Sequence, residues 1–223
     1  MTDDHERSKL LDRQTALSGL IENVYELMGE DKEGEAAEVW AEIAEDIWPV
    51  IDGVVTELNL DKKPTEDKID RSYDKPYELN SVLADADVAL AYSGQNEARL
   101  ELNRRILDTF DTSSERYQYF SAKQAVAESL NGLGRYEECD SFLKEWKQEN
   151  ESEVYPDFVR LRCLYDRKQD NDEVKALADA YMAKKEIDAP HEDVMMLYEM
   201  IALIYGELGE SELKQEAEER MNA

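Results

Sequence analysis

The chain of 223 residues contains few prolines, glycines and cysteines. Five Pro and nine Gly occur, whereas helix-favouring residues such as Ala, Leu, Glu, Lys and Arg are abundant, which predicts an all-α fold. No run of 18 or more apolar residues is present, so no transmembrane helix is predicted. The first twelve residues are charged where a secretory signal would be apolar, and we expect a cytoplasmic protein.

Residues that carry catalysis or bind metals are scarce as well. Cys139 and Cys163 lie within helical apolar patterns, which is typical of small buried side chains and not of a disulfide framework. The two histidines, His5 and His191, have no partner at metal-ligand spacing. Glycine-rich phosphate loops, nucleophile elbows and dinucleotide fingerprints are absent. The sequence therefore predicts no catalytic residues, no metal and no cofactor, and we do not expect an enzyme.

Basic residues are strongly outnumbered by acidic ones. The chain has 54 Asp and Glu against 26 Lys and Arg, a formal net charge of −28. Residues 1–61 hold 17 acidic and 4 basic residues, nearly half of the excess. This charge repels nucleic acids and anionic membranes, so neither is an expected partner. Two interpretations stay open: a solvated face that keeps the protein soluble, or a docking surface for a basic partner.

One pattern recurs five times: an apolar residue, a large apolar residue four positions later, and usually Gly four positions after that. The copies are Ile21/Tyr25/Gly29, Ala86/Leu90/Gly94, Val126/Leu130/Gly134, Leu161/Tyr165/Gln169 and Ile201/Tyr205/Gly209. Residues four apart share one face of a helix, and a Gly just past the last turn adopts the left-handed conformation that ends it. The middle residues are spaced by 65, 40, 35 and 40 positions, which predicts helical hairpins.

A second amphipathic run follows each of these stops. The runs are Ala36/Trp40/Ile43/Ile47, Ala98/Leu102/Ile106, Cys139/Leu143/Trp146, Val174/Ala178/Tyr181 and Leu213/Ala217/Met221. A single hairpin of this kind cannot bury its apolar stripe, so neighbouring hairpins must stack to form a continuous core.

The fifth copy resembles a tetratricopeptide repeat through Tyr198, Ile201, Ala202, Tyr205 and Gly209, and the third copy is similar. The resemblance covers residues 14–222 and departs from the family at Gln169, where Gly is expected. It implies a right-handed superhelical array of about five antiparallel hairpins, a tetratricopeptide-like α-solenoid. The whole chain is also similar to small stand-alone tetratricopeptide-like proteins of Gram-positive bacteria. Neither resemblance implies a particular function.

These patterns predict one domain over residues 1–223. We expect a flexible tail at 1–13, a first hairpin with an extra helix at 14–59, an inserted exposed loop at 60–76 and four further hairpins at 77–223. The loop is either an ordinary solvated connection or a segment that folds over the first hairpin or gates a groove. Pro49 predicts a kink or a split in its helix. Trp40 and Trp48 are predicted to lie in the core.

From the repeat and the charge together we expect a non-enzymatic module that binds a protein or peptide, with basic partners favoured, in a groove lined by the first helices. Residues at outward positions on these helices are candidates for lining the groove: Asn23, Tyr92, Gln124, Glu128, Asn131, Asp166 and Arg167. Asn and Gln bond a peptide backbone, and Arg167 is suited to a ligand carboxylate. Two alternatives stay open: a homodimer formed through the apolar last copy, and a regulatory sensor of peptides.

Overall fold

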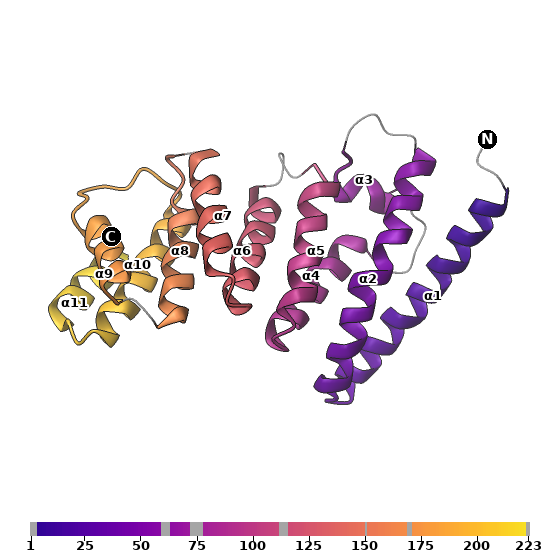
Figure 1. The fold of residues 1–223 in the computed structure, drawn as a ribbon, viewed down its shortest axis with the longest axis horizontal. Helices are drawn as coiled ribbons and strands as arrows, with labels where there is room; N and C mark the ends of the chain where they lie inside the picture. Colours follow the sequence, from indigo (N-terminus) through magenta and orange to yellow (C-terminus); the bar gives the residue numbers. More distant parts are fainter. Residues whose placement is uncertain are drawn as a thin grey trace. The chain divides into compact units, whose positions relative to one another are not determined.

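The computed structural model describes residues 4–58, 63–71, 78–111, 116–149, 151–168 and 171–221. All regular secondary structure in these ranges is helical, which confirms the predicted all-α class (Figure 1). The chain divides into two compact units, unit 1 (Met1–Ser129) and unit 2 (Leu130–Ala223). The helices are α1 (Asp4–Gly29), α2 (Glu33–Leu58), α3 (Glu66–Arg71), α4 (Leu79–Tyr92), α5 (Asn96–Thr109), α6 (Arg116–Gly132), α7 (Tyr136–Glu149), α8 (Tyr155–Arg167), α9 (Asn171–Met182), α10 (His191–Glu207) and α11 (Ser211–Met221).

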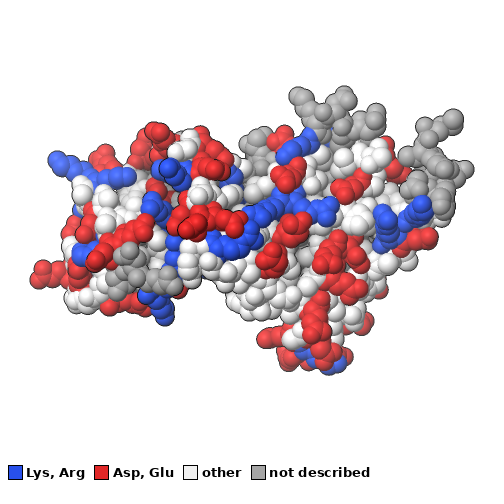
Figure 2. Space-filling model, in the orientation of Figure 1, with Lys and Arg blue, Asp and Glu red and all other residues white. Residues whose placement is uncertain are grey.

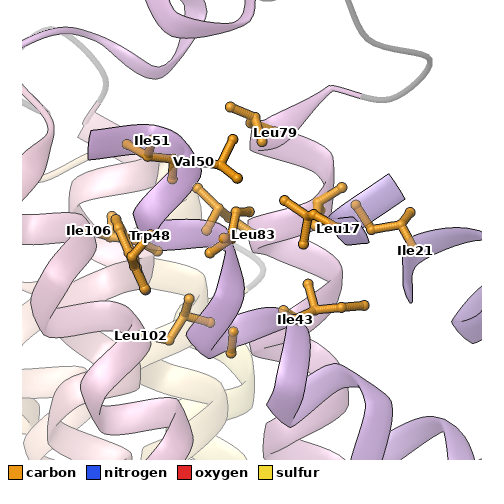
Figure 3. Packing of buried hydrophobic residues seen from close by; sticks show 14 of the residues in the cluster. Leu17, Ile21, Ile43, Trp48, Val50, Ile51, Leu79, Leu83, Leu102 and Ile106 are labelled. Atoms are coloured by element: carbon orange, nitrogen blue, oxygen red, sulfur yellow. The ribbon is translucent and has the colours of Figure 1, made fainter. Parts of the chain in front are cut away.

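Unit 1 is built around α2, which packs against α1, α3, α4 and α5. Figure 3 shows apolar side chains from these helices meeting in one cluster, with Trp48 close to Leu102 and Ile106 of α5. Trp40 and Trp48 are each only 1% exposed, so their predicted place in the core is confirmed. Burial of such large rings supplies much of the hydrophobic stabilisation of a small unit.

The helix that contains Pro49 is not split. α2 runs without interruption for 26 residues, although Pro49 lacks the N–H that would complete an intrahelical hydrogen bond. Buried side chains flank the proline on both sides, among them Ile47, Trp48, Val50 and Ile51. Packing of both halves against the same core offsets the local cost of the proline, so of the two predicted outcomes, a kink or a split, the split does not occur.

The predicted flexible tail is helical from Asp4 onward, because α1 begins there, and residues 1–3 lie outside the described part. Leu10 is 8% exposed and packs on Gly53 of α2. A Cβ atom added at Gly53 would lie 2.5 Å from Leu10 Cδ1, so the glycine makes room for this contact. The buried side chain of Leu10 thus holds the first turns of α1 on α2. The charged composition of these residues gave no sign of this tertiary contact.

The predicted exposed loop at 60–76 contains helix α3, and its residues 60–62 and 72–76 lie outside the described ranges. Ile69 is fully buried in the core of unit 1. Asp70 accepts a hydrogen bond of 2.6 Å from the backbone N–H of Leu79, the first residue of α4. Its carboxylate thereby satisfies an N–H group that a helix start leaves unpaired. The described part of the segment is a packed structural element, in contrast to the prediction.

The turns after the first helices of the hairpins share one backbone conformation. Gly94, Gly134 and Gly209 have φ values of 70°, 71° and 76°, in the left-handed region that glycine tolerates best. The residue after each glycine donates its N–H to a carbonyl five positions earlier, as in Gln95 to Leu90 at 2.9 Å. This arrangement is a Schellman motif, and the predicted glycine stops are confirmed at these three turns.

The first and fourth turns reach the left-handed conformation without glycine. After α1, the residue with positive φ is Asp31, at 56°, and Lys32 donates its N–H to the carbonyl of Leu27. At the end of α8 the residue is Lys168, at 51°. Gly29 ends α1 instead of occupying the turn, and Gln169 lies outside the described residues.

Unit 2 has its own core. α10 packs against α8, α9 and α11, and α7 packs against α8. Tyr205 is fully buried, together with Leu197 and Ile201 of the same helix and Ala178 and Ala217 of its neighbours. The apolar positions of the predicted fifth copy therefore form the centre of this unit.

Candidate functional site

The predicted groove residues fall into separate places in the two units. In unit 1, Asn23 and Tyr92 are exposed, whereas Gln124 and Glu128 are half-buried. In unit 2, Asn131 is buried, Asp166 is exposed and Arg167 is half-buried. The structure brings Gln124 together with Glu128 and Asn131 together with Arg167, each pair within its own unit.

Gln124 and Glu128 belong to a polar network centred on Arg99 of α5. Arg99 donates to Asp87 of α4 and to Glu128 of α6, both at 2.9 Å. Gln124 donates to the second oxygen of Glu128 at 2.7 Å, and Asn103 donates to Asp87 at 2.6 Å. These groups are therefore committed to joining three helices. A ligand would have to displace an internal ion pair to reach Glu128.

Burial lowers the pKa of Arg99, but its hydrogen bonds and its attraction to Asp87 and Glu128 outweigh burial and raise it. The guanidinium remains charged and fully neutralised by two carboxylates. Arg99 was not predicted from the sequence. Arg99 and Asn103 are four positions apart and therefore share a face of α5, beside the apolar stripe of Leu102 and Ile106. A basic residue at the edge of an apolar stripe is the signal that was available.

Arg167 of unit 2 lies in a similar network at the end of α8. Its guanidinium donates to both oxygens of Asp140 at 2.7 and 3.0 Å, and its Nε donates to Asn131 at 2.6 Å. The ring of Tyr136 lies 4.7 Å from the guanidinium carbon, a cation–π distance. The carboxylate that Arg167 binds is thus Asp140 of the same chain. A ligand carboxylate, the predicted partner of Arg167, would have to displace Asp140 to reach the guanidinium.

Five large apolar side chains of unit 1 are exposed on the described parts of α1 and α4. Leu11, at 60%, lies in the first half of α1; we call the other four the α1–α4 strip: Tyr25 at 42%, Met28 at 50%, Val88 at 52% and Tyr92 at 91%. The hydroxyl of Tyr25 donates to Asp85 of α4 at 2.5 Å, which places the two helices side by side at this point. Burial and this bond to Asp85 raise the pKa of Tyr25 to about 12. The hydroxyl therefore stays protonated and retains its bond at neutral pH.

The spacing within each helix explains why these side chains share a face. Met28 follows Tyr25 by three positions, and Tyr92 follows Val88 by four. Tyr25 is further supported from below by Trp40, whose ring it meets edge to face at a centroid distance of 5.7 Å. Asn23 does not join the strip, because a residue two positions from Tyr25 points to another face of α1.

Exposed carboxylates lie on the same two helices as the α1–α4 strip. Glu22 and Glu26 are exposed on α1, and Asp85 is exposed on α4. Acidic side chains also dominate the tip where α1 meets α2, visible in red at the lower edge of Figure 2. These two helices thus expose aromatic and aliphatic side chains together with carboxylates. Such a surface suits a ligand that is both apolar and basic.

Unit 2 has a depression of about 620 Å³ between α7 and α8, but several of its charged groups are already paired. Lys147 forms an ion pair with Asp157 at 2.8 Å, and Arg160 pairs with Glu173 at 2.7 Å. The lining holds acidic and basic groups in similar numbers. It presents no concentration of one charge that would select a small ionic ligand.

No metal site assembles in the described part of the chain. Among those residues, no group of three or more metal-ligating side chains lies together. His191 is exposed at the start of α10, and the side chain of His5 lies outside the described residues. No described helix combines the length and apolarity that a bilayer span requires.

The fold and the α1–α4 strip define an all-helical protein with an exposed aromatic and acidic surface. In comparisons with known proteins, no family model, no curated protein and no solved structure matches the chain. Its function is therefore argued from its own residues.

Proposed function

We propose that this chain is a non-enzymatic binding module of the tetratricopeptide-like class, which holds a basic protein or peptide segment in a groove lined by the first helices of its hairpins. The recurrent Schellman turns after α4, α6 and α10 support the repeat. The packing of α10 on both helices of the preceding hairpin, α8 and α9, also supports it, since stacked hairpins make such contacts.

The α1–α4 strip is the observation that carries the proposal. Tyr92 has 91% of its surface exposed although it is a large aromatic residue, and Tyr25, Met28 and Val88 are exposed on the same two helices. Tyrosine rings anchor ligands at small cost in conformational entropy, and methionine adapts to varied shapes. Exposed surface of this kind marks interaction sites in soluble proteins.

The carboxylates determine which ligand is favoured. Glu22, Glu26 and Asp85 would each attract a lysine or arginine of the ligand, and an exposed ion pair contributes about 0.2–1 kcal/mol. We therefore expect an affinity on the order of micromolar that weakens as salt is added. The net charge of −28 speeds encounter with a basic partner and repels an acidic one.

The test uses a displayed library of random twelve-residue peptides, selected for binding to the purified full chain. Enriched peptides should combine basic with aromatic or aliphatic residues, and their affinity should fall between 50 and 300 mM salt. Met28→Gln and Tyr92→Ser should each weaken binding about tenfold or more. Met195→Gln is the matched control, because Met195 is an exposed methionine of unit 2, at 39%, outside the strip.

Failure to enrich any peptide would contradict the proposal. Peptides whose affinity is unchanged by both Met28→Gln and Tyr92→Ser would also contradict it. Peptides lost equally in Met28→Gln and Met195→Gln would place the binding surface elsewhere. Circular dichroism of each variant checks that the helices are retained.

The alternative of self-association depends on apolar residues of the last copy being exposed. Tyr198, Met200, Ile204 and Tyr205 are all at most 7% exposed within unit 2, so they cannot form a dimer surface. A regulatory peptide sensor would use the same strip, and the selected peptides would then identify its class of signal. Light scattering across micromolar concentrations separates both cases from a homodimer.

A further inference from the structure

Two thiols meet between α7 and α8 of unit 2. Cys139 lies on α7 and Cys163 on α8, and these helices pack against each other. Both cysteines are free and buried, with exposed fractions of 0% and 1%. Cys163 lies close enough for a side-chain hydrogen bond to lower the pKa of Cys139. The sequence pattern predicts two separate buried side chains, so only the tertiary structure reveals the pair.

A chain of hydrogen bonds surrounds the pair. Asp140, the residue after Cys139, accepts both guanidinium bonds from Arg167 at 2.7 and 3.0 Å. Arg167 also donates to Asn131 at 2.6 Å, and the Asn131 amide donates to the backbone carbonyl of Cys163 at 3.1 Å. The two cysteine positions are therefore held together by contacts that do not involve the thiols themselves.

The surroundings favour the thiolate of Cys139. The hydrogen bond from Cys163 is the largest influence and lowers the pKa of Cys139; the charge and hydrogen bond of Arg167 lower it further. Burial and the charge of Asp140 act in the opposite direction but do not prevail. Cys139 also lies in the first turn of α7, where the peptide dipoles stabilise a negative charge. The thiolate is the form that reacts with oxidants.

We propose that Cys139 and Cys163 form an oxidation site for hydrogen peroxide, at which the two thiols become a disulfide that joins α7 to α8. The Cys139 thiolate attacks one oxygen of the peroxide, the O–O bond breaks, hydroxide leaves, and Cys139 becomes a sulfenic acid. The sulfur of Cys163 then attacks the sulfur of Cys139. An S–S bond forms, and the sulfenic oxygen leaves as water with the proton of Cys163. Two thiols are oxidised and one peroxide is reduced.

Burial of the pair determines which oxidant it accepts. With almost no exposed surface on either cysteine, a bulky disulfide reagent has no access in the folded protein. Hydrogen peroxide is close to water in size and enters through small fluctuations of the packing. The folded protein should therefore react with peroxide while resisting Ellman's reagent, which reacts with both thiols only after unfolding in urea.

The experiment treats the folded full chain with hydrogen peroxide, removes the peroxide with catalase, and then unfolds the protein in N-ethylmaleimide. Denaturing mass spectrometry should show the loss of two hydrogen atoms and no maleimide adduct, and dithiothreitol should restore two reactive thiols. Two maleimide adducts after peroxide treatment would overturn the proposal. A disulfide between two chains in place of one within the chain would also overturn it.

Single substitutions assign the roles. Cys163→Ser should leave a sulfenic acid on Cys139 that dimedone traps, whereas Cys139→Ser should leave Cys163 unreacted. The reverse assignment of the trapped sulfenic acid would contradict the proposed order. Cys163→Ala and Cys139→Ala repeat the test with a side chain better suited to an apolar site, and circular dichroism checks folding in each case.

Two neighbouring variants separate electrostatics from packing. Arg167→Met removes the cation beside Cys139 and should slow the peroxide reaction by up to about tenfold, because a higher pKa leaves a smaller fraction of Cys139 as thiolate while each thiolate becomes more nucleophilic. Asp140→Asn breaks the same ion pair but removes a negative charge, so it should leave the rate unchanged or increase it. Equal slowing in both variants would show that the ion pair acts through packing alone and would contradict the thiolate role of Cys139.

Discussion

The two units bury their aromatic side chains in different ways. In unit 1, the indole N–H groups of Trp40 and Trp48 are buried and have no hydrogen-bond partner among the described residues. In unit 2, the hydroxyl of buried Tyr205 donates to Asp179 at 2.6 Å, and that of Tyr181 donates to Asp157. These two aromatic residues of unit 1 are therefore held by apolar packing, whereas the two of unit 2 add carboxylate bonds whose strength depends on pH.

The difference shows how two helical units of one chain accommodate a net charge of −28. In unit 1, many acidic side chains are exposed on α1 and α2, and the core contains Trp40 and Trp48. Unit 2 turns two of its carboxylates toward tyrosine hydroxyls at the edge of its core. The following predictions test this comparison, beginning with the largest expected effect.

Trp48→Ala should destabilise unit 1 by ~3–5 kcal/mol, and Tyr205→Ala should destabilise unit 2 by a similar amount, since each removes a fully buried large ring. Urea unfolding followed by circular dichroism measures the change, and hydrogen exchange assigns it to one unit. An unchanged urea midpoint for either variant would show that its ring does not support the core. Met195→Ala, an exposed position, should cost less than about 0.5 kcal/mol.

Glu66→Gln should stabilise unit 1 at pH 8 by about 3 kcal/mol and leave it unchanged at pH 4. Burial of Glu66, with a smaller contribution from the charge of Asp70, raises its pKa from 4.5 to about 7 in the folded state. A carboxyl whose pKa rises on folding favours the folded state least when it is ionised, so stability falls as pH rises from 4.5 to about 7. Urea midpoints across this range measure the effect; parallel curves for the two proteins would contradict it.

Arg99→Met should destabilise unit 1 by ~1.5–3 kcal/mol, because it leaves Asp87 and Glu128 partly buried without their cation. Asp140→Asn should cost unit 2 only ~0.2–1 kcal/mol from its ion pair, since the side chain of Asp140 is 48% exposed and the bond from Arg167 to Asn131 stays in place. The ratio of the two urea-derived free energies is the measurement. Equal losses would show that solvent exposure of the partner does not control these networks.

Tyr205→Phe should cost unit 2 about 0.5–1.5 kcal/mol near neutral pH, the contribution of one hydrogen bond. The pKa of Asp179 is lowered chiefly by its bond from Tyr205, so this stabilisation is lost as pH falls below the ordinary value of 3.8. Burial and the same bond raise the pKa of Tyr205 above 10.0, so it is also lost as pH rises beyond that value. Thermal midpoints should therefore converge for the two proteins at both extremes, and a constant difference would contradict the assignment.

Local features of the fold followed from the sequence where the responsible residues are close together. The glycine stops at 94, 134 and 209 and the apolar spacing of Trp40 with Ile43 and Ile47 were predictable, since helix period and left-handed turns are properties of short segments. The candidate site was predicted less well. Tyr92 is exposed on the strip, but Tyr25 was assigned to the repeat pattern alone, and its exposure depends on how α1 meets α4.

By itself, the sequence determined the helical class, the positions of the hairpin turns and the excess of negative charge, because each depends on composition or on residues within a few positions of one another. Only the tertiary structure decided that Leu10 and Ile69 are buried, that Pro49 lies within a continuous helix, and that Cys139 meets Cys163. These outcomes depend on contacts between residues distant in the chain, whose packing energy outweighs local preference.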